Sequence, residues 1–186
     1  MSRARAAALL TLALPGAVYI YQGEELGLWE VEDIPPARRQ DPMYRRSGAT
    51  NPGRDGCRVP LPWSGAAPPF GFSPPGSDAA PWLPQPAAWR DHTIEKQAGD
   101  PGSILTLYQA ALRLRRQTPA LRERQPMSWL HADECVLAFR RGADFVCMVN
   151  LSQRPVALPP ELEPVLFSEP DLAGSLPPDT AAWLSE

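Results

Sequence analysis

The sequence is poor in the residues that build metal centres and disulfide frameworks. Its 186 residues include three cysteines, Cys57, Cys135 and Cys147, and two histidines, His92 and His131. The cysteines are odd in number, and no spacing among these five residues matches that of a metal site. We therefore expect reduced thiols, no metal, no cofactor and a cytoplasmic location.

Lysine is almost absent, which weighs against a nucleic-acid-binding protein. Lys96 is the only lysine, and the formal net charge is -3 at pH 7. Residues 38–58 are locally basic through arginine, but a phosphate-binding surface usually adds lysines and exposed aromatic residues. The sequence also has no apolar run long enough to span a membrane. We therefore predict that neither nucleic acid nor membrane is a partner.

Proline, by contrast, is abundant. It accounts for 24 of 186 residues, about 13%, against a usual share of about 5%. The prolines gather between Pro60 and Pro86 and again after Pro155. Because proline fixes φ and has no N–H, these stretches are predicted to be loops. Hydrophobic residues still make up 44% of the chain, so we expect a folded core rather than disorder.

The amino-terminal stretch fits two descriptions. "MSRARAAALLTLALPGA" has early arginines, an apolar run and small residues, as a secretory signal does. It is also a good buried helix that ends at Pro15-Gly16. We favour the helix because Ala17 to Gln22 follows as a β-branched and aromatic run, typical of a strand buried on both faces. A helix, a tight turn and a buried strand form one repeat of an α/β protein.

Residues 24 to about 100 show no convincing helix or strand pattern, although short helical turns fit. Ordinary strand-to-helix loops have about two to six residues. Disorder fits poorly because the segment carries seven aromatic residues that supply buriable surface. We expect an ordered loop held by these aromatic anchors: Trp29, Tyr44, Trp63, Phe70, Phe72, Trp82 and Trp89.

The clearest helix of the sequence follows this loop. Asp100 or Ser103 can cap its start, and Pro119 ends it. Its apolar residues recur at helical spacing, which indicates core packing: Ile104, Leu107, Tyr108, Ala111 and Leu114.

From about Ser128 the pattern changes to that of an antiparallel sheet. "CVLAFRRGADFVCMVNLS" has two apolar runs around "RRGAD", which predicts a hairpin. "RPVALPP" and "EPVLFSE" follow as short strands with proline at their ends. Cys135 and Cys147 flank the hairpin turn and can lie near each other, although a disulfide between them is not our expectation.

The stretch "GRDGCRVPLPW", residues 53–63, places two arginines beside a stiff proline-rich run. A guanidinium is a planar fork of donors suited to carboxylates and hydroxyls, and proline restricts the backbone. Both a pre-ordered polar site and an ordinary surface turn fit these residues. Glu24 and Glu25 follow the predicted strand directly, where ligand groups collect in α/β proteins. Adjacent residues of an extended segment point apart, so we do not expect an acid–base pair.

Two stretches stand in a characteristic order: "LPGAVYIYQGEELGL" and then "DIPPARRQDPMYRRSGATNPGRDGCRVPLPW". Together they resemble the alpha-amylase family of glycoside hydrolases (family 13), in its alpha-glucosidase and oligo-1,6-glucosidase branch. The first looks like the last strand of that family's (β/α)8 barrel, and the second like the long segment after it. "PWLPQPAAW" and the helix from Ser103 look like the approach to the final barrel helix, and the tail looks like the carboxyl-terminal β-sandwich domain.

The resemblance implies an α/β part followed by an all-β part. Residues 1–122 are predicted to be the last helix, strand, loop and helix of a (β/α)8 barrel, with the long loop at 24–100. Residues 123–186 are predicted to be a small antiparallel β-sandwich domain.

The resemblance also implies that the catalytic carboxylates lie outside the matched segment. The family uses an aspartate nucleophile, a glutamate acid/base and a further aspartate, all on earlier barrel strands. A retaining glycosidase needs two carboxyls about 5 Å apart. Because no part of this sequence matches those motifs, we assign no catalytic residue. We predict that the chain is the carboxyl-terminal fragment of an alpha-glucosidase that acts on alpha-linked gluco-oligosaccharides. We also predict that this fragment is inactive by itself.

For the arginine-rich loop, the resemblance implies contact with sugar. Arginines of an Arg-Asp-x-x-Arg loop help close the pocket for a terminal glucose in this branch, which makes Arg54 and Arg58 the predicted substrate-binding residues. The alternative for each arginine is that it only holds the loop in place. Asp55 is expected to pair with a nearby arginine rather than to touch sugar.

The predicted partners follow from the same resemblance. They are a malto- or isomalto-oligosaccharide once the barrel is completed, and the missing amino-terminal barrel part. Self-association is an alternative, because "LLTLALPGAVYIY" is uncharged and β-prone. Two other interpretations stay open: a non-catalytic module that binds carbohydrate or protein, and an incomplete gene product without a role of its own.

Overall fold

The computed structural model describes residues 1–74, 76–77, 80–122, 125–170, 172 and 174–186. These residues form two compact units. The first unit comprises Met1–Tyr19 and Pro101–Glu186, and the second is Ile20–Asp100. The domain boundary predicted between residues 122 and 123 falls where residues 123 and 124 lie outside the described ones, and it stays a prediction.

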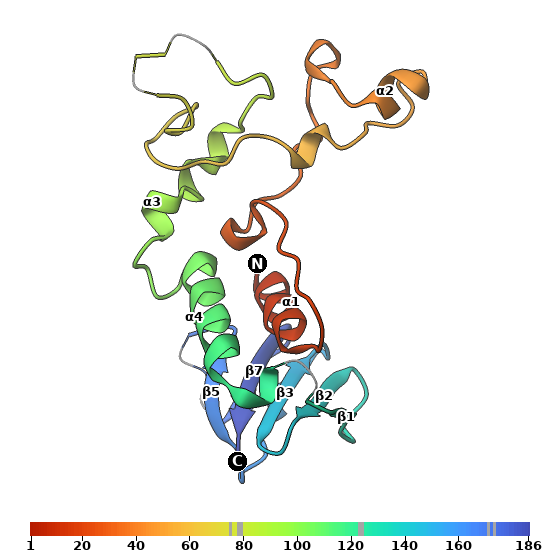
Figure 1. The fold of residues 1–186 in the computed structure, drawn as a ribbon, viewed down its shortest axis with the longest axis vertical. Coiled ribbons are helices and arrows are strands. Elements are labelled where there is room, and N and C mark those ends of the chain that lie inside the picture. The colour runs from red at the N-terminus through yellow and green to blue at the C-terminus, as the bar shows by residue number, and fades with distance from the viewer. Residues whose placement is uncertain (75, 78–79, 123–124, 171, 173) are drawn as a thin grey trace. The chain divides into compact units, whose positions relative to one another are not determined.

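The first unit is built on a five-stranded antiparallel sheet with the strand order β1-β2-β3-β7-β5 (Figure 1). Its strands are β1 (Met127–Trp129), β2 (Val136–Arg141), β3 (Phe145–Asn150), β5 (Glu163–Phe167) and β7 (Thr180–Ser185). A two-stranded sheet pairs β4 (Val156–Ala157) with β6 (Ser175–Leu176). The predicted antiparallel domain is confirmed, as are its hairpin β2–β3 and the strands in "RPVALPP" and "EPVLFSE".

The sequence interpretation missed β7, which joins β3 to β5 inside the sheet. Trp183 of this strand is completely buried, and its indole N–H donates to the Leu9 carbonyl at 3.0 Å. Five of the six residues of β7 are buried. A strand covered on both faces has no alternation of polar and apolar residues, so its pattern was not visible.

Two helices cover one face of the five-stranded sheet (Figure 1): α1 (Ser2–Ala13) and α4 (Ile104–Gln117). Both helices were predicted from the sequence. Ser103 caps α4 by accepting a hydrogen bond from the Thr106 N–H, as expected. Leu9 of α1 and Leu107 of α4 pack into the same core as Trp183. The amino-terminal helix is therefore part of the sheet unit.

Two arginines hold the carboxyl end of α1. Their acceptors are the carbonyls of Leu12, Leu14 and Gly16 for Arg115, and that of Ala13 for Arg141. The last carbonyls of a helix have no partner within it, and positive charge is favoured at this end. These bonds give partners to the carbonyl groups at the end of the helix and in the turn at Pro15-Gly16.

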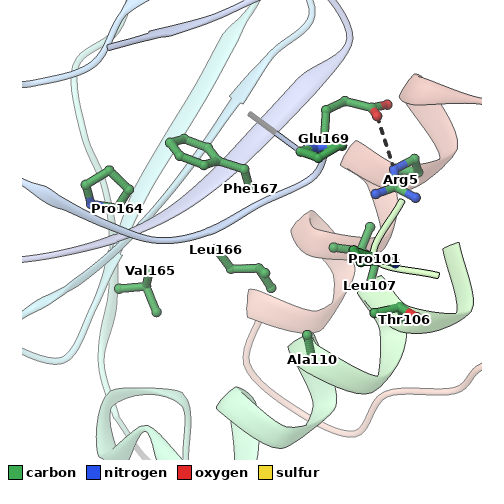
Figure 2. A pocket seen from close by; sticks show the side chains of 11 residues that line it. Arg5, Pro101, Thr106, Leu107, Ala110, Pro164, Val165, Leu166, Phe167 and Glu169 are labelled. Carbon is green, nitrogen blue, oxygen red and sulfur yellow. Dashed lines mark ion pairs between the residues drawn. The ribbon is translucent and has the colours of Figure 1, made fainter. Parts of the chain in front are cut away.

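A pocket of about 300 Å³ lies between α4 and β5 in the first unit (Figure 2). Arg5 and Glu169 close one end of it with an ion pair of 3.5 Å. The guanidinium of Arg5 is buried and also donates to the carbonyls of Ser168 and Gly102. The polar end of the pocket thus binds α1 to neighbouring segments of its own unit.

The strand predicted at Ala17–Gln22 is not formed. Residues 17–20 belong to no helix or strand, and Tyr19 is 88% exposed. No residue in the described part of the chain hydrogen-bonds to the backbone of residues 17–20. A strand exists only where a neighbouring segment completes its ladder of hydrogen bonds, and none of the described segments does so for these residues.

The second unit is an ordered loop with short helical turns, as predicted. The turns are η1 (Glu24–Leu26), η2 (Pro36–Arg38), α2 (Pro42–Arg46), η3 (Asp55–Cys57), η4 (Ala87–Asp91) and α3 (Ile94–Gln97). Its buried apolar core has five members, Val31, Ile34, Val59, Phe70 and Trp89. Four of the seven aromatic residues expected to be anchors are instead about half exposed: Trp29, Trp63, Phe72 and Trp82.

Candidate functional site

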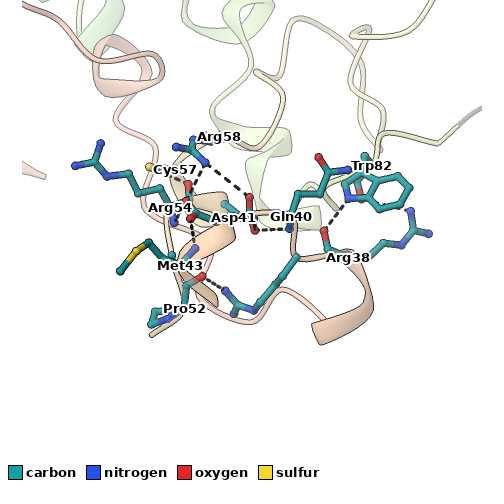
Figure 3. Close-up of polar contacts among 12 residues, drawn as sticks. Arg38, Gln40, Asp41, Met43, Pro52, Arg54, Cys57, Arg58 and Trp82 are labelled. Atoms are coloured by element: carbon teal, nitrogen blue, oxygen red, sulfur yellow. Dashed lines mark hydrogen bonds and ion pairs between the residues drawn. The ribbon is translucent and has the colours of Figure 1, made fainter. Parts of the chain in front are cut away.

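Two buried carboxylates organise the loop that contains "GRDGCRVPLPW" (Figure 3). Asp55 is 2% exposed, and its Oδ2 accepts hydrogen bonds from the N–H groups of Gln40 at 2.7 Å and Asp41 at 2.9 Å. Arg58 Nη1 lies 4.0 Å from the other oxygen of Asp55. The predicted pairing of Asp55 with an arginine is therefore present, but backbone amides are its nearer partners.

Asp41 is the centre of this network. Its Oδ1 accepts from the Met43 N–H at 2.9 Å and caps α2. Its Oδ2 accepts from the Arg54 N–H at 2.9 Å and from Arg58 Nη1 at 3.0 Å. The hydrogen bonds from Met43 and Arg54, and the nearby charge of Arg58, lower the pKa of Asp41. Gly53 must stay a glycine, because it has a φ of 72° and an added Cβ would lie 2.6 Å from the Asp41 Cβ.

Sequence reasoning did not identify Asp41 as a site residue. A signal was present, since an aspartate followed by proline is typical of the start of a helix. A helix of five residues is too short for its periodicity to be visible, so this start was read as loop.

The structure gives the two arginines different surroundings. Arg58 pairs with Asp41 and keeps 46% of its side chain exposed. Arg54 contributes its backbone to the network, while its exposed guanidinium makes no hydrogen bond or ion pair with any described residue (Figure 3). Arg58 therefore holds the loop, and Arg54 is free to meet a ligand. The assignment of both as substrate-binding residues stays a prediction.

Glu24 and Glu25 lie on the turn η1, not on an extended segment as expected. Glu24 Oε2 accepts from the Tyr21 N–H at 3.2 Å, and Glu25 Oε2 accepts from the Gly23 N–H at 2.9 Å. Both carboxylates thus bind the backbone at the start of their own turn. Their arrangement serves the local fold.

A cavity of about 250 Å³ opens beside η3 within the second unit. Tyr21 and Cys57 line it, with the hydroxyl oxygen 3.5 Å from the sulfur. Trp89 also lines it, and its buried indole N–H has no hydrogen-bond partner in the described part of the chain. The other lining residues are Gln22, Glu24, Leu28, Trp29, Glu30, Gly56, Val59 and Leu61.

The histidines and cysteines are separate from one another. His92 lies 3.2 Å from the Leu26 carbonyl and packs edge-on against Trp29. All three cysteines are free, and Cys147 pairs with Phe139 in the β2–β3 hairpin rather than with Cys135. Over the ranges that the structure describes, no three His, Cys, Asp or Glu residues are grouped to hold a metal ion, and no helix is long and apolar enough to cross a membrane.

Comparison with known protein families decides the lineage. The family profile described as "Alpha amylase, catalytic domain" matches residues 1–124. The chain belongs to the alpha-amylase family. A second profile, described as a domain of unknown function (DUF3459), matches residues 129–183 of this alpha-amylase family chain.

Curated relatives carry names from the branch that the sequence motifs indicated. The "Probable alpha-glucosidase" of Rhizobium meliloti (strain 1021) is 36% identical over 154 residues, which cover 81% of this chain and 27% of that protein. The "Oligo-1,6-glucosidase" of Halalkalibacterium halodurans is 28% identical over 188 residues, with 91% and 32% covered. The chain thus spans about a quarter to a third of the length of these relatives.

Similarity to solved structures confirms the predicted fold class. The alpha-glucosyl transfer enzyme XgtA matches with a TM-score of 0.79 and 34% identity, over 99% of this chain and 35% of that one. Isomaltulose synthase (PalI) from Klebsiella sp. LX3 also has a TM-score of 0.79, with 24% identity, over 99% and 38%. At that identity the second likeness concerns the fold alone.

Proposed function

We propose that this chain is the carboxyl-terminal part of an alpha-glucosidase-type glycoside hydrolase that acts on alpha-linked gluco-oligosaccharides. We further propose that it does not hydrolyse them by itself. The family match over residues 1–124 and the names of the curated relatives support the substrate class. A cytoplasmic location stays a prediction.

The observation that carries the proposal is the use of carboxylates in the second unit. Asp41, Asp55, Glu24 and Glu25 all accept hydrogen bonds from backbone N–H groups. A retaining glycosidase needs one carboxylate free to attack and one carboxylic acid able to donate a proton. Asp41 is a poor proton donor, because its pKa is lowered. These four carboxylates therefore build the loop, and the proposal takes the reacting pair from another part of the barrel.

The same loop presents the groups that suit a sugar. The free guanidinium of Arg54 and the half-exposed guanidinium of Arg58 are rigid donors for hydroxyl groups. The Asp41–Asp55 network fixes the backbone that carries both arginines. Positioning of a substrate by preordered donors lowers the entropy lost in binding. The contribution of this chain is thus substrate contact.

Complementation tests this proposal. The chain is co-expressed with the segment of the R. meliloti relative that precedes the matched region, and glucose release is measured from maltose, isomaltose and a chromogenic alpha-glucoside. We expect release by the pair and none by the chain alone. Arg54→Gln should lower the rate of the pair about tenfold or more. Arg90→Gln is the matched control, since Arg90 is an exposed arginine of the same unit that pairs with its neighbour Asp91.

Glucose release by the chain alone, abolished by a substitution within this chain, would contradict the proposal. An active pair in which Arg54→Gln and Arg90→Gln behave alike would remove Arg54 from the substrate contacts. It would leave the lineage of the chain unaffected.

A second function is favoured by the exposed aromatic side chains of the second unit. Trp29, Trp63, Phe72 and Trp82 are each about half exposed, and such rings are common in ligand sites. They fit a non-catalytic module that binds carbohydrate. Titration calorimetry with glucose and maltose distinguishes the two functions. Millimolar or tighter binding that depends on Arg54, with no turnover after addition of the barrel part, favours the module.

A further inference from the structure

A cavity of about 340 Å³ lies against the second face of the five-stranded sheet, within the first unit. Side chains of β2 and β3 alternate between the two faces of the sheet. Phe139 and Cys147 belong to the core that α1 and α4 cover. Ala138, Val146 and Met148 belong to the other core, and they line the cavity. The cavity is therefore on the face turned away from the two helices.

The interior of this cavity is apolar and aliphatic. Its floor consists of Ala138, Val146 and Met148, which are at most 7% exposed, and Val156 and Leu162 also line it. Among the described residues that line the cavity, none is Phe, Tyr or Trp. Binding sites for small molecules begin at about 300 Å³ and are mostly apolar, with a few polar groups that fix the orientation of the ligand. The size and lining favour a short aliphatic chain over a flat aromatic ring.

The charged side chains that line the cavity leave an excess of negative charge. Arg140 Nη1 and Glu186 Oε1 form an ion pair of 2.7 Å, so their charges offset each other. Asp133 and Glu161 line the same cavity and are exposed. Neither of these two carboxylates makes a hydrogen bond or an ion pair with any residue in the described ranges. An apolar interior thus lies beside two carboxylates that have no cation of their own.

We propose that this cavity binds a short aliphatic ammonium ion, of the class of primary alkylamines. The alkyl chain lies on the floor formed by Ala138, Val146 and Met148, where each methylene group removed from water favours binding. The ammonium group stays at the exposed side of the cavity, beside Asp133 and Glu161. A long apolar stem with its charged end in water is the arrangement that amphipathic chains adopt on protein surfaces.

The charge of the two carboxylates selects this ligand over its close analogues. An alkyl alcohol of the same length gains only from burial of its chain. An alkyl carboxylate gains the same from its chain but is repelled by Asp133 and Glu161. The proposal uses no residue of the second unit, so it is independent of sugar binding and of the proposed glucosidase lineage.

Methionine methyl groups provide a direct readout of the cavity. The chain has four methionines, of which Met148 lines the cavity. Met127 packs against the helix-covered core, and Met43 is 48% exposed in the second unit, so these two report binding elsewhere. The full chain with isotope-labelled methionine methyl groups is titrated with hexylammonium, hexanol or hexanoate at about pH 8, where alkylamines carry their charge.

We expect hexylammonium to shift the Met148 methyl signal with a millimolar Kd, while the signals of Met43 and Met127 stay in place. Hexanol should bind about threefold more weakly and hexanoate about tenfold more weakly at low salt, because partly exposed charges contribute modestly. The differences among the three ligands should shrink in 1 M salt, where the Debye length is about 3 Å.

Variants separate the charge from the cavity. Asp133→Asn combined with Glu161→Gln should remove the preference for hexylammonium over hexanol and leave the affinity for hexanol unchanged. Glu134→Gln is the matched control, because Glu134 is an exposed carboxylate next to Asp133 that is not among the residues lining the cavity. It should largely retain the preference. Ala138→Leu fills the floor and should abolish binding of all three ligands.

Three results would overturn the proposal. The first is a Met148 signal that none of the three ligands shifts. The second is an equal affinity for hexylammonium and hexanoate. The third is an equal affinity for hexylammonium and hexanol, which would assign the cavity to uncharged apolar molecules. Because the comparison of ligands uses the unaltered chain, misfolding of a variant does not affect it, and a failure would leave the proposed function untouched.

Discussion

The two units of this chain are ordered by different physics. The first unit has a regular sheet, two helices and a continuous apolar core that includes Leu9, Phe139 and Trp183. Among its described residues, the second unit has only short turns and a small apolar cluster of five buried residues, but its loop closes around the buried carboxylates of Asp41 and Asp55. A long proline-rich loop with a small apolar core can therefore be held in place by hydrogen bonds from backbone N–H groups to buried carboxylates.

The largest loss of stability is expected from a substitution in the apolar core of the first unit. Trp183→Ala removes a completely buried indole and its hydrogen bond to Leu9, and should lower the free energy of unfolding by about 3–5 kcal/mol. Trp129→Ala is the matched control, because Trp129 is 64% exposed on β1, and it should cost less than about 1 kcal/mol. Urea unfolding followed by circular dichroism measures both. An equal decrease in the free energy of unfolding for the two variants would show that Trp183 does not lie in the core.

The next largest effect is expected on amide exchange in the second unit, when its carboxylate network is altered. Asp41→Asn removes the charge that accepts hydrogen bonds from Met43, Arg54 and Arg58. Amide exchange at Met43 and Arg54 should become about tenfold faster, while exchange in β3 stays unchanged. Hydrogen exchange with mass spectrometry follows both regions at once. If the amide exchange rate in β3 changed as much as that at Met43, the two units would not be independently stabilised.

The same network predicts a pH dependence with a defined sign. Because the folded structure lowers the pKa of Asp41, its stabilising contribution is present above the unfolded pKa of about 3.9 and is lost as the pH falls through the lower folded pKa. Protection of the Met43 and Arg54 amides should therefore persist at pH 5 and disappear on acidification below about pH 4. In Asp41→Asn this acid transition should be absent.

A smaller effect, on self-association, is expected from the segment between α1 and η1. Residues 17–20 are largely apolar and have no backbone hydrogen bond to any described residue, so they are expected to promote self-association. Tyr19→Lys places a charge on a side chain that is 88% exposed, and should shift the chain towards the monomer in sizing chromatography. Lys is tolerated at this site because nothing is packed over Tyr19. An unaltered elution volume would assign self-association to another surface.

Much of the first unit could be predicted from the sequence, because its elements have strong local signals. Ser103 marks the start of α4, Pro15-Gly16 marks the end of α1, and "RRGAD" marks the hairpin turn. The strand β7 was missed because it is covered on both faces and shows no alternation. The strand predicted at 17–22 is not formed, because its local pattern is that of a strand but no described residue hydrogen-bonds to the backbone of residues 17–20.

The candidate site was predicted less completely. "GRDGCRVPLPW" identified Arg54 and Arg58, but not that Arg58 is held by Asp41 while Arg54 is free. Asp41 lies 13 residues before Arg54 in the chain, and no local pattern connects them. Long-range polar contacts of this kind depend on the closed shape of the loop, which a sequence pattern does not contain.

Hydrogen exchange on residues 17–20 shows whether this chain is one part of a barrel with a separately folded sheet unit. Exchange is compared for the chain alone and for the chain co-expressed with the preceding segment of the R. meliloti relative. We expect residues 17–20 to exchange without protection in the chain alone and to become protected in the pair, while β3 is protected equally in both. Protection of residues 17–20 in a monodisperse monomer of the chain alone, or no gain in the pair, would contradict it.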